Sequence, residues 1–332
     1  FQAEDGIRDL VRSRGLGDVY KRQDLEQEKA AYKEILALKE KDSALIPDFS
    51  VLVSDGNARV GEFRMPRHSL QTPTFMPVGT RGSIRTITSQ DLEEIGADII
   101  LGNTYHLMLR PGEALIEEFG GIHGFANWPR LILTDSGGYQ VFSLEPYVDD
   151  DGVEFKSTYD GSMHRLTPEK AVEIQISLGS DIQMVLDVCP PIPAEIGVVE
   201  MAVERTHQWA KRGRDHFLNI RDSGHSDKAQ FGIVQGGLNS DLRRVSAEQI
   251  VEVGFDGYAI GGLSVGETRQ EMIEPMNISV EGLPVDRPRY FMGLGDPAGL
   301  VEAIASGVDT VSYTHLRAHE TVLDLVCRLL LE

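Results

Sequence analysis

The stretch RLILTDSGG, residues 130–138, is a continuous apolar run that stops at an aspartate followed by small residues. Seven similar runs recur along the chain: PTFMPVG (73–79), DIILGNTY (98–105), DIQMVLDV (181–188), QFGIVQGG (230–237), GYAIGGLS (257–264), YFMGLGDP (290–297) and one that begins at Gly307. Strands that are apolar on both faces are typical of a parallel sheet covered by helices. The runs therefore predict an α/β fold.

Helix-forming segments separate most of these runs, for example SQDLEEIGA (89–97), TPEKAVEIQISLGS (167–180) and DPAGLVEAIASG (296–307). Eight strand–helix units predict a closed (β/α)8 TIM barrel, and an open doubly wound sheet is the alternative. Residues 146–166 alternate in character and contain the turn dipeptide Asp160-Gly161. We therefore expect a small β insertion, a hairpin, after strand 3.

Both ends of the chain depart from this pattern. Back-translation of QAEDGIRD (2–9) and SRGLGDVYKRQ (13–23) gives sequences that resemble a flow-cell primer and a transposase tag. SYTHLRAHE (312–320) and LVCRLLL (325–331) resemble the same oligonucleotides reversed. Natural termini are the alternative, but two mutually complementary ends are hard to obtain by chance.

This interpretation sets the expected domain organisation. Residues 1–23 and 310–332 would be adapter-like, non-native tails. Residues 24–47 are charged and favour a lead-in helix that Pro47 ends. Residues 48–309 would form the TIM-barrel domain, which would be incomplete because its last strand is lost.

The charge balance limits the classes of function. The chain carries 32 basic and 52 acidic residues, and its formal net charge is −20. The expected tails hold seven of each, so the remainder still carries 25 − 45 = −20. This acidity argues against promiscuous nucleic-acid binding, although a local basic patch could still bind RNA.

The cysteine count and the hydropathy indicate the compartment. Cys189 and Cys327 cannot form a disulfide framework or a four-cysteine metal site. No apolar run reaches the ~18 residues of a membrane span. We therefore expect a cytoplasmic protein with no membrane partner.

Chemistry-bearing residues stand where the predicted strands end, which is where TIM barrels hold their functional groups. These residues are Asn103, Asp135, Asp187, Gln235, Gly262, and Met292 or Gly293. Carboxylates accept hydrogen bonds from ring N–H and amino groups, whereas an amide and a backbone N–H donate to a carbonyl. The set predicts a site that reads the edge of a planar heterocycle, with Tyr139 and Met292 stacking on its two faces.

Several of these residues also have a purely structural interpretation. Asp135 could cap the helix that follows it, and Gln235 could belong to a turn. Cys189 is more often a packing residue than a nucleophile, and His106 is more often structural than catalytic. Asp187 closes an apolar strand, where an unpaired carboxylate would be costly. GLGDPAG (293–299) is weak as a dinucleotide motif, although loops after strands 7 and 8 often hold phosphate.

Five motifs together resemble those of the tRNA-guanine transglycosylase family, the bacterial preQ1-type queuine tRNA-ribosyltransferases. They are NTYHLMLRPG (103–112), TDSGGYQVFSL (134–144), GIVQGG (232–237), YAIGGLSVGE (258–267) and RYFMGLGDP (289–297). The likeness covers nearly all of residues 50–309. It implies a TIM-barrel pentosyltransferase that exchanges guanine at the tRNA wobble position for the deazaguanine preQ1 in queuosine biosynthesis.

The resemblance also implies roles for single residues. Asp135 matches an aspartate that contacts the base and handles protons, and Asp187 matches one that reads the guanine N1 and 2-amino edge. Gln235 and the Gly262 N–H match donors to O6. The expected substrate-binding set is Asp135, Ser136, Tyr139, Asp187, Cys189, Gln235, Gly262, Leu263 and Met292. The expected RNA-binding stretch is Gly293, Leu294, Gly295, Asp296, Pro297, Ala298 and Gly299.

Specificity is also implied by the resemblance. Cys189 and Val265 match bacterial members that use preQ1. Val188 stands where many bacterial members carry an acidic residue, which leaves the fine base preference open. The implied partners are tRNA, guanine or preQ1, and, for the complete protein, a second copy in a homodimer.

The family continues its last strand as GVD-M-F-D-C, and the second aspartate is its nucleophile. In register, that position here is Ser312, and a serine without an adjacent base is a poor substitute for a carboxylate nucleophile. We therefore expect the chain as written to be inactive. The family's structural Zn²⁺ is implied, but its Cys-x-Cys-x-x-Cys…His ligand set is not found here; Cys189, His207 and His216 lack metal-like spacing.

Two alternatives to a transglycosylase stay open. A non-catalytic subunit that binds a base or tRNA would explain the missing nucleophile. An unrelated barrel enzyme, such as an aldolase or a phosphosugar isomerase, is suggested by the fold alone. Against it, none of the predicted strand ends carries a lysine that could form a Schiff base.

Overall fold

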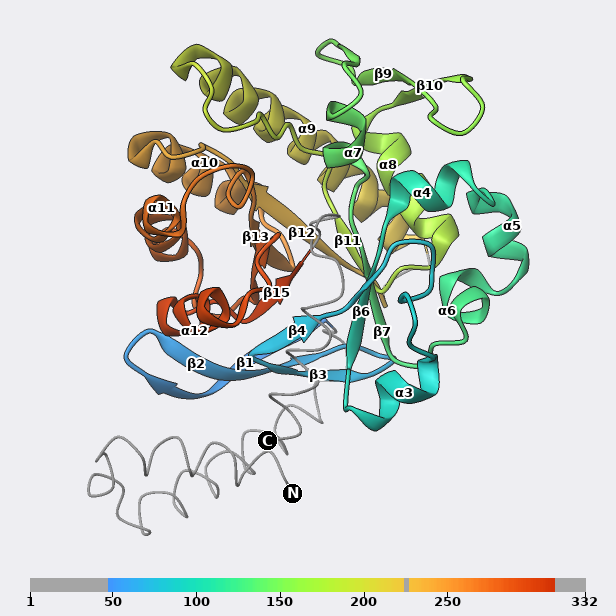
Figure 1. The fold of residues 1–332 in the computed structure, drawn as a ribbon, viewed down its shortest axis with the longest axis horizontal. Coiled ribbons are helices and arrows are strands. Elements are labelled where there is room, and N and C mark those ends of the chain that lie inside the picture. Colours follow the sequence, from blue (N-terminus) through green and yellow to red (C-terminus); the bar gives the residue numbers. More distant parts are fainter. Residues whose placement is uncertain (1–46, 224–226, 314–332) are drawn as a thin grey trace. The chain divides into compact units, whose positions relative to one another are not determined.

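The structure is a computed structural model, and it describes residues 47–223 and 227–313 (Figure 1). The expected tail 1–23, most of the expected lead-in helix 24–47 and the end of the tail 310–332 lie outside the described residues. Within the described part, no helix combines the length and the apolar character needed to cross a membrane.

A closed parallel barrel forms the centre of the fold. Its strands are hydrogen-bonded in the order β4-β15-β14-β13-β12-β11-β7-β6-β5. β4 (Thr74–Met76) and β5 (Val78–Gly79) are two halves of one strand, interrupted at Pro77. Because β15 pairs with β4 and β5 pairs with β6, the sheet closes into eight strands. The predicted (β/α)8 barrel is confirmed, and the open-sheet alternative is wrong.

The other barrel strands coincide with the apolar runs of the sequence. They are β6 (Ile99–Gly102), β7 (Leu131–Thr134), β11 (Ile182–Met184), β12 (Ala229–Val234), β13 (Gly257–Ile260), β14 (Arg289–Met292) and β15 (Thr310–Ser312). Nearly every residue in them is buried, since one face fills the barrel and the other packs under helices.

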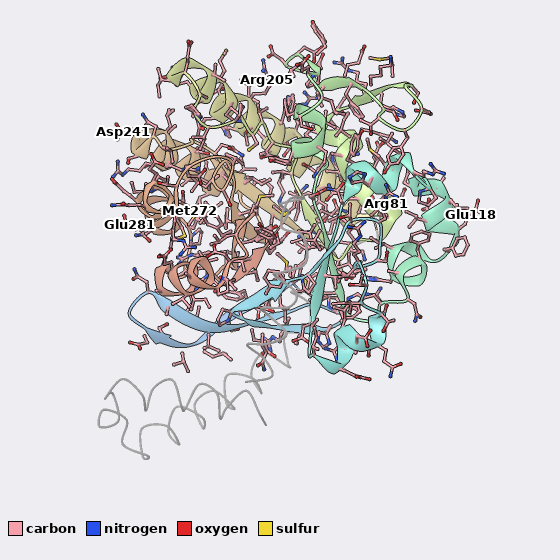
Figure 2. The ribbon with its side chains drawn as sticks, in the orientation of Figure 1. Arg81, Glu118, Arg205, Asp241, Met272 and Glu281 are labelled. Atoms are coloured by element: carbon pink, nitrogen blue, oxygen red, sulfur yellow. The ribbon has the colours of Figure 1, made fainter. Side chains whose placement is uncertain are left out.

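Helices surround the barrel (Figure 1). They are α3 (Ser89–Glu94), α4 (Thr104–Leu109), α5 (Glu113–Glu118), α6 (Gly121–Ala126), α7 (Gly138–Phe142), α8 (Pro168–Leu178), α9 (Ile196–Asp222), α10 (Ser240–Val253), α11 (Arg269–Glu281) and α12 (Pro297–Ser306). Their ends follow local chemistry: Thr268 caps α11 and forms a reciprocal capping box with Glu271. The same helix buries Met272 and leaves Glu281 exposed at its other end (Figure 2).

The predicted β insertion after strand 3 is present, and it has one strand more than a hairpin. β8 (Tyr147–Val148), β9 (Val153–Lys156) and β10 (Met163–Leu166) form a small antiparallel sheet. The turn between β9 and β10 contains Gly161 at φ +76°, a conformation that glycine adopts without strain.

A second antiparallel sheet, β1 (Asp48–Asp55), β2 (Ala58–Arg64) and β3 (Ser69–Thr72), was not predicted. It lies beside the end of the barrel from which the strands start (Figure 1). Phe63 of β2 packs against Phe231 of β12, with 6.0 Å between ring centroids. Apolar residues at every second position of 49–53 and a turn glycine at Gly56 were the available signals, although Leu52 between them is also apolar.

The expectation that the last strand is lost is wrong. Thr310–Ser312 forms β15 and pairs in register with both neighbours: Val311 lies between Phe291 and Phe75. A barrel strand needs only backbone hydrogen bonds and apolar inward side chains, and Thr-Val-Ser provides enough of both. Formation of this strand does not depend on whether the side chain at position 312 can act as a nucleophile.

One buried ion pair ties the β1–β3 sheet to β15. The Arg59 guanidinium donates to the Asp309 carboxylate, with Nε–Oδ1 at 2.8 Å, and both side chains are almost fully buried. Arg59 also donates to the carbonyls of Val285 and Arg287, and Asp309 accepts from the Arg289 backbone N–H. The network joins the start of strand 8 to β2.

Removing either partner should strongly destabilise the fold, because the other charge would remain buried without compensation. We expect Arg59→Met to lower the free energy of unfolding by about 3–5 kcal/mol in denaturant titrations. Arg244→Met, at an exposed ion pair with Asp241, should change it by less than about 0.5 kcal/mol. Equal effects of the two substitutions would show that the Arg59–Asp309 pair does not support the barrel.

Candidate active site

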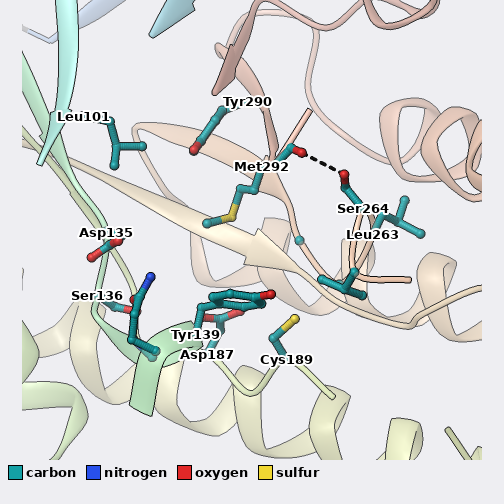
Figure 3. Close-up of a pocket in the computed structure, with 16 residues that line it drawn as sticks. Leu101, Asp135, Ser136, Tyr139, Asp187, Cys189, Leu263, Ser264, Tyr290 and Met292 are labelled. Atoms are coloured by element: carbon teal, nitrogen blue, oxygen red, sulfur yellow. Dashed lines mark hydrogen bonds between the residues drawn. The ribbon is translucent and has the colours of Figure 1, made fainter. Parts of the chain in front are cut away.

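A pocket opens at the carboxyl ends of the barrel strands, as the sequence predicts (Figure 3). Loops after β7, β11, β13 and β14 contribute most of its wall. Its lining residues are Leu101, Asp135, Ser136, Gly138, Tyr139, Gln140, Asp187, Cys189, Gly261, Gly262, Leu263, Ser264, Val265, Tyr290, Met292 and Gly293.

Asp135 follows directly after β7 and is held by three donors. Asn103 Nδ2 donates to its Oδ2 at 2.6 Å, and the backbone N–H groups of Thr104 and Gly137 donate to its Oδ1 at 2.9 and 3.0 Å. Burial raises the pKa of Asp135 to about 7, and the nearby Asp187 adds to this rise while the three donors oppose it. A carboxyl with a pKa near neutrality can both give and take a proton.

Asp187 lies beyond the end of β11, 6% exposed. Gln235, which follows β12, donates from Nε2 to Asp187 Oδ2 at 2.6 Å. Burial raises the pKa of Asp187 to about 6, although this hydrogen bond lowers it. Gln235 Oε1 is buried and has no hydrogen-bond partner among the described residues. Gln235 itself is fully buried and is not among the residues that line the pocket, so Asp187 is the member of the pair that faces it.

Apolar side chains complete the walls. The Tyr139 ring, about half exposed, and the Met292 side chain face one another across the pocket (Figure 3). Cys189 lines the pocket, and burial raises the pKa of its thiol to about 12, so it is a neutral thiol near neutral pH. The geometry suits a flat ring inserted between Tyr139 and Met292.

Gly262 cannot be replaced without disturbing the site. Its φ is +63°, and a Cβ atom there would stand 2.2 Å from Gln235 Oε1. The absence of a side chain lets the backbone approach the Asp187–Gln235 pair closely. Leu263 and Val265, from the same loop, also line the pocket.

The stretch 293–299 is only partly at the pocket. Gly293 lines it and accepts from Ser264 Oγ at 2.7 Å. Asp296 caps α12 by accepting from the Gly299 N–H, and it also pairs with Arg269. The predicted contact of this stretch with RNA stays a prediction. His106 is half-buried, with Nδ1 at 2.8 Å from the Tyr159 hydroxyl.

Ser312 is fully buried in β15, and its Oγ lies 2.5 Å from the Tyr290 hydroxyl. Tyr290 lines the pocket, so Ser312 sits immediately behind the wall. Tyr290 is not among the site residues predicted from the sequence. Its place in the run RYFM gives no signal, because tyrosine is common in buried strands.

No group of three or more His, Cys, Asp or Glu side chains within 47–223 and 227–313 could hold a metal ion. The described residues therefore do not fit the Zn²⁺ that the resemblance implies.

Comparison with known proteins agrees with this geometry. Residues 54–323 match the family described as queuine tRNA-ribosyltransferase. A protein of that name from Thermotoga neapolitana is 50% identical over 280 residues, covering 83% of this chain and 74% of its own. Relatives of the same name from Caldanaerobacter subterraneus and Halothermothrix orenii are 52% and 48% identical. They cover 76% and 80% of this chain, and 66% and 71% of their own.

The fold and the match define a TIM-barrel pentosyltransferase of the class that modifies tRNA. The chain belongs to the queuine tRNA-ribosyltransferase family.

The raised pKa of Asp187 predicts a measurable cost in stability. Its ordinary pKa in an unfolded chain is about 3.9. Between that value and about 6 the folded protein keeps a proton that the unfolded chain loses, so stability falls as the pH rises through this window. We expect Asp187→Asn to exceed the unsubstituted chain in free energy of unfolding by about 2–3 kcal/mol at pH 8.

The gain from Asp187→Asn should shrink as the pH approaches 4, which denaturant titrations at several pH values would measure. Asp241→Asn, at an exposed position on α10, is the matched control and should change little. An Asp187→Asn variant that is less stable at pH 8 would show that the charged carboxylate is well compensated.

Proposed function

We propose that the pocket binds guanine and the deazaguanine preQ1, and that it serves base exchange at the wobble position of tRNA in queuosine biosynthesis. The observation that supports this most directly is the buried Asp187–Gln235 pair beside Gly262. Guanine presents donors at N1 and at its 2-amino group, next to an acceptor at O6. Asp187 supplies the matching acceptor and the Gly262 N–H a donor; Gln235, whose Nε2 donates one hydrogen to Asp187, would add the second hydrogen of that nitrogen.

Stacking and proton transfer would complete recognition. Tyr139 and Met292 would hold the two faces of the base. Asp135, with its pKa raised to about 7, would exchange protons with the base that leaves or enters. The target nucleotide would be flipped out of the RNA to reach the pocket, and the stretch 293–299 would contact the RNA backbone.

The exchange itself needs a nucleophile. In the family's reaction a carboxylate attacks the ribose C1′, the bond from C1′ to guanine breaks, and guanine leaves with a proton. The ring N–H of preQ1 then loses its proton as that nitrogen attacks C1′ and releases the carboxylate. Here the corresponding position is Ser312, which is buried against Tyr290. A hydroxyl without a neighbouring base does not form this ester readily.

Ser312 also supports a second candidate function. A chain that binds guanine and tRNA without forming the covalent intermediate would act as a non-catalytic partner subunit. In either function the partners would be tRNA and a guanine-type base in the cytoplasm, with a homodimer as the expected assembly. The described residues offer no ligand set for the Zn²⁺ that the family implies, so no part of this proposal involves it.

Base binding is the first test. Calorimetric titration should detect guanine binding by this chain, whichever of the two functions is correct. Asp187→Ala should weaken it about 10- to 100-fold, because a hydrogen bond to a charged group contributes roughly 1.5–3 kcal/mol. The exposed Asp241→Ala should bind like the unsubstituted chain. Absence of guanine binding by a folded chain would contradict the proposal.

Exchange separates the two candidates. We expect this chain not to incorporate labelled guanine into a tRNA that carries guanosine at the wobble position. Ser312→Asp should allow a covalent tRNA adduct that survives denaturing electrophoresis, and Ser312→Asn should not. Adduct formation by the unsubstituted chain would mean that Asp135 or another group is the nucleophile. Base and tRNA binding without an adduct in any variant would favour the partner subunit.

A further inference from the structure

Arg243, on α10, is a fully buried arginine that contacts no carboxylate by hydrogen bond or ion pair among the described residues. Its guanidinium donates only to backbone carbonyls, those of Gly237 at 2.8 Å, Gly261 at 2.7 Å, Gly262 at 3.1 Å and Val234 at 3.2 Å. Burial lowers its pKa to about 9, so it remains charged near neutral pH. Burying a guanidinium costs desolvation free energy, so we ask what this arginine contributes in return.

The acceptors of Arg243 lie at the carboxyl ends of two neighbouring strands. Val234 and Gly237 bracket Gln235 at the end of β12, whereas Gly261 and Gly262 follow β13. Arg243 itself does not line the pocket, but Gly261 and Gly262 do. The guanidinium therefore holds the loops from behind the pocket wall.

The direction of these carbonyls fixes the direction of the adjacent N–H groups. In a trans peptide the C=O and the N–H of the next residue point in opposite directions. Because the Gly261 carbonyl points to Arg243, the Gly262 N–H must point away from it. The Gly262 carbonyl directs the Leu263 N–H in the same way. The Gly262 N–H is a donor toward the thiol of Cys189, which lines the pocket.

The next peptide is held differently. The Ser264 and Val265 N–H groups donate to the Glu267 carboxylate, so they are already engaged. Two successive N–H groups, of Gly262 and Leu263, are therefore the backbone donors that this loop directs away from Arg243. A thiol is a weak acceptor, and a carbonyl oxygen of a ligand would replace it favourably.

We propose that Arg243 is a positioning residue that aims the Gly262 and Leu263 N–H groups at the carbonyl oxygen of the bound base, so that the pocket selects 6-oxo purines. This inference rests on the proposed function, since it assumes that the pocket binds guanine. Arg243, a residue outside the pocket, would thus contribute to the preference for guanine.

The test compares guanine with 6-thioguanine, which keeps the N1–H and the 2-amino group but carries a weakly accepting sulfur in place of oxygen. Affinities would be measured calorimetrically on the full chain. Arg243→Met should weaken guanine binding about 10-fold or more, as expected for two misaligned hydrogen bonds. It should leave 6-thioguanine binding within about 3-fold, so that the preference for guanine largely disappears. Arg243→Lys keeps the charge but not the fork of donors, so its affinity for guanine should lie between those of the unsubstituted chain and Arg243→Met.

Arg289→Met is the matched control. Arg289 is also buried and also donates to backbone carbonyls, those of Leu283 and Gly307, but it stands at the start of β14. Its loss should lower stability and leave the preference for guanine unchanged. Equal weakening of both bases by Arg243→Met would reduce Arg243 to a structural role and overturn the inference.

A second measurement decides the matter if Arg243→Met does not fold. In the unsubstituted chain, guanine should shift the amide ¹H resonances of Gly262 and Leu263 downfield and leave that of Ser264 nearly unchanged. Unshifted Gly262 and Leu263 amides in a guanine-saturated protein would overturn the inference while sparing the proposed function. Failure of the unsubstituted chain to bind guanine would overturn both.

Discussion

Closure of the sheet between β15 and β4 is the constraint on which the rest of the structure depends. A closed barrel leaves no strand edge unpaired, and it brings the carboxyl ends of all eight strands to one opening. Asp135, Asp187, Gln235 and Gly262 are distant in sequence and meet only because of this ring. The buried Arg59–Asp309 pair reinforces the closing strand where it starts, far from the chemistry. The stabilising ion pair thus lies where the barrel strands start, and the pocket lies where they end.

The reactive end is organised at a cost to stability. Two carboxyls with raised pKa values share one pocket, and behind it stands the Arg243 guanidinium, which pairs with no carboxylate in the part of the chain that the structure describes. An apolar or neutral side chain in place of either carboxyl or of the guanidinium would make the fold more stable. Their common effect is to fix acceptors and donors at the pocket, which in the proposed function would need no rearrangement when a base enters. The site is therefore preorganised by buried charged groups that lower the stability of the fold.

The sequence predicts the barrel well because its signals are repeated eight times: apolar runs, intervening helices and polar residues at the strand ends. The same logic predicts that Asp135, Asp187 and Gly262 meet at one opening, and all three line the pocket. It fails for β1–β3, where the alternation is short and one strand has a bulge between Val51 and Val53. It fails for Arg243 and Tyr290 because their importance comes from contacts across strands, and neither helix periodicity nor strand pattern reports such contacts. The loss of the last strand was wrongly inferred from residue identity, whereas strand formation depends on backbone pairing.

The position of the β1–β3 sheet affects how a ligand can enter and leave the pocket. Phe49, Phe63 and Leu70 of this sheet join the same buried cluster as the barrel residues, and Phe63 lies against Phe231. This sheet packs against one end of the barrel, and the pocket opens at the other. In the proposed base exchange, a departing base and an arriving base would share this opening. With one base stacked between Tyr139 and Met292, as proposed, the departing base would have to leave before the arriving base could enter.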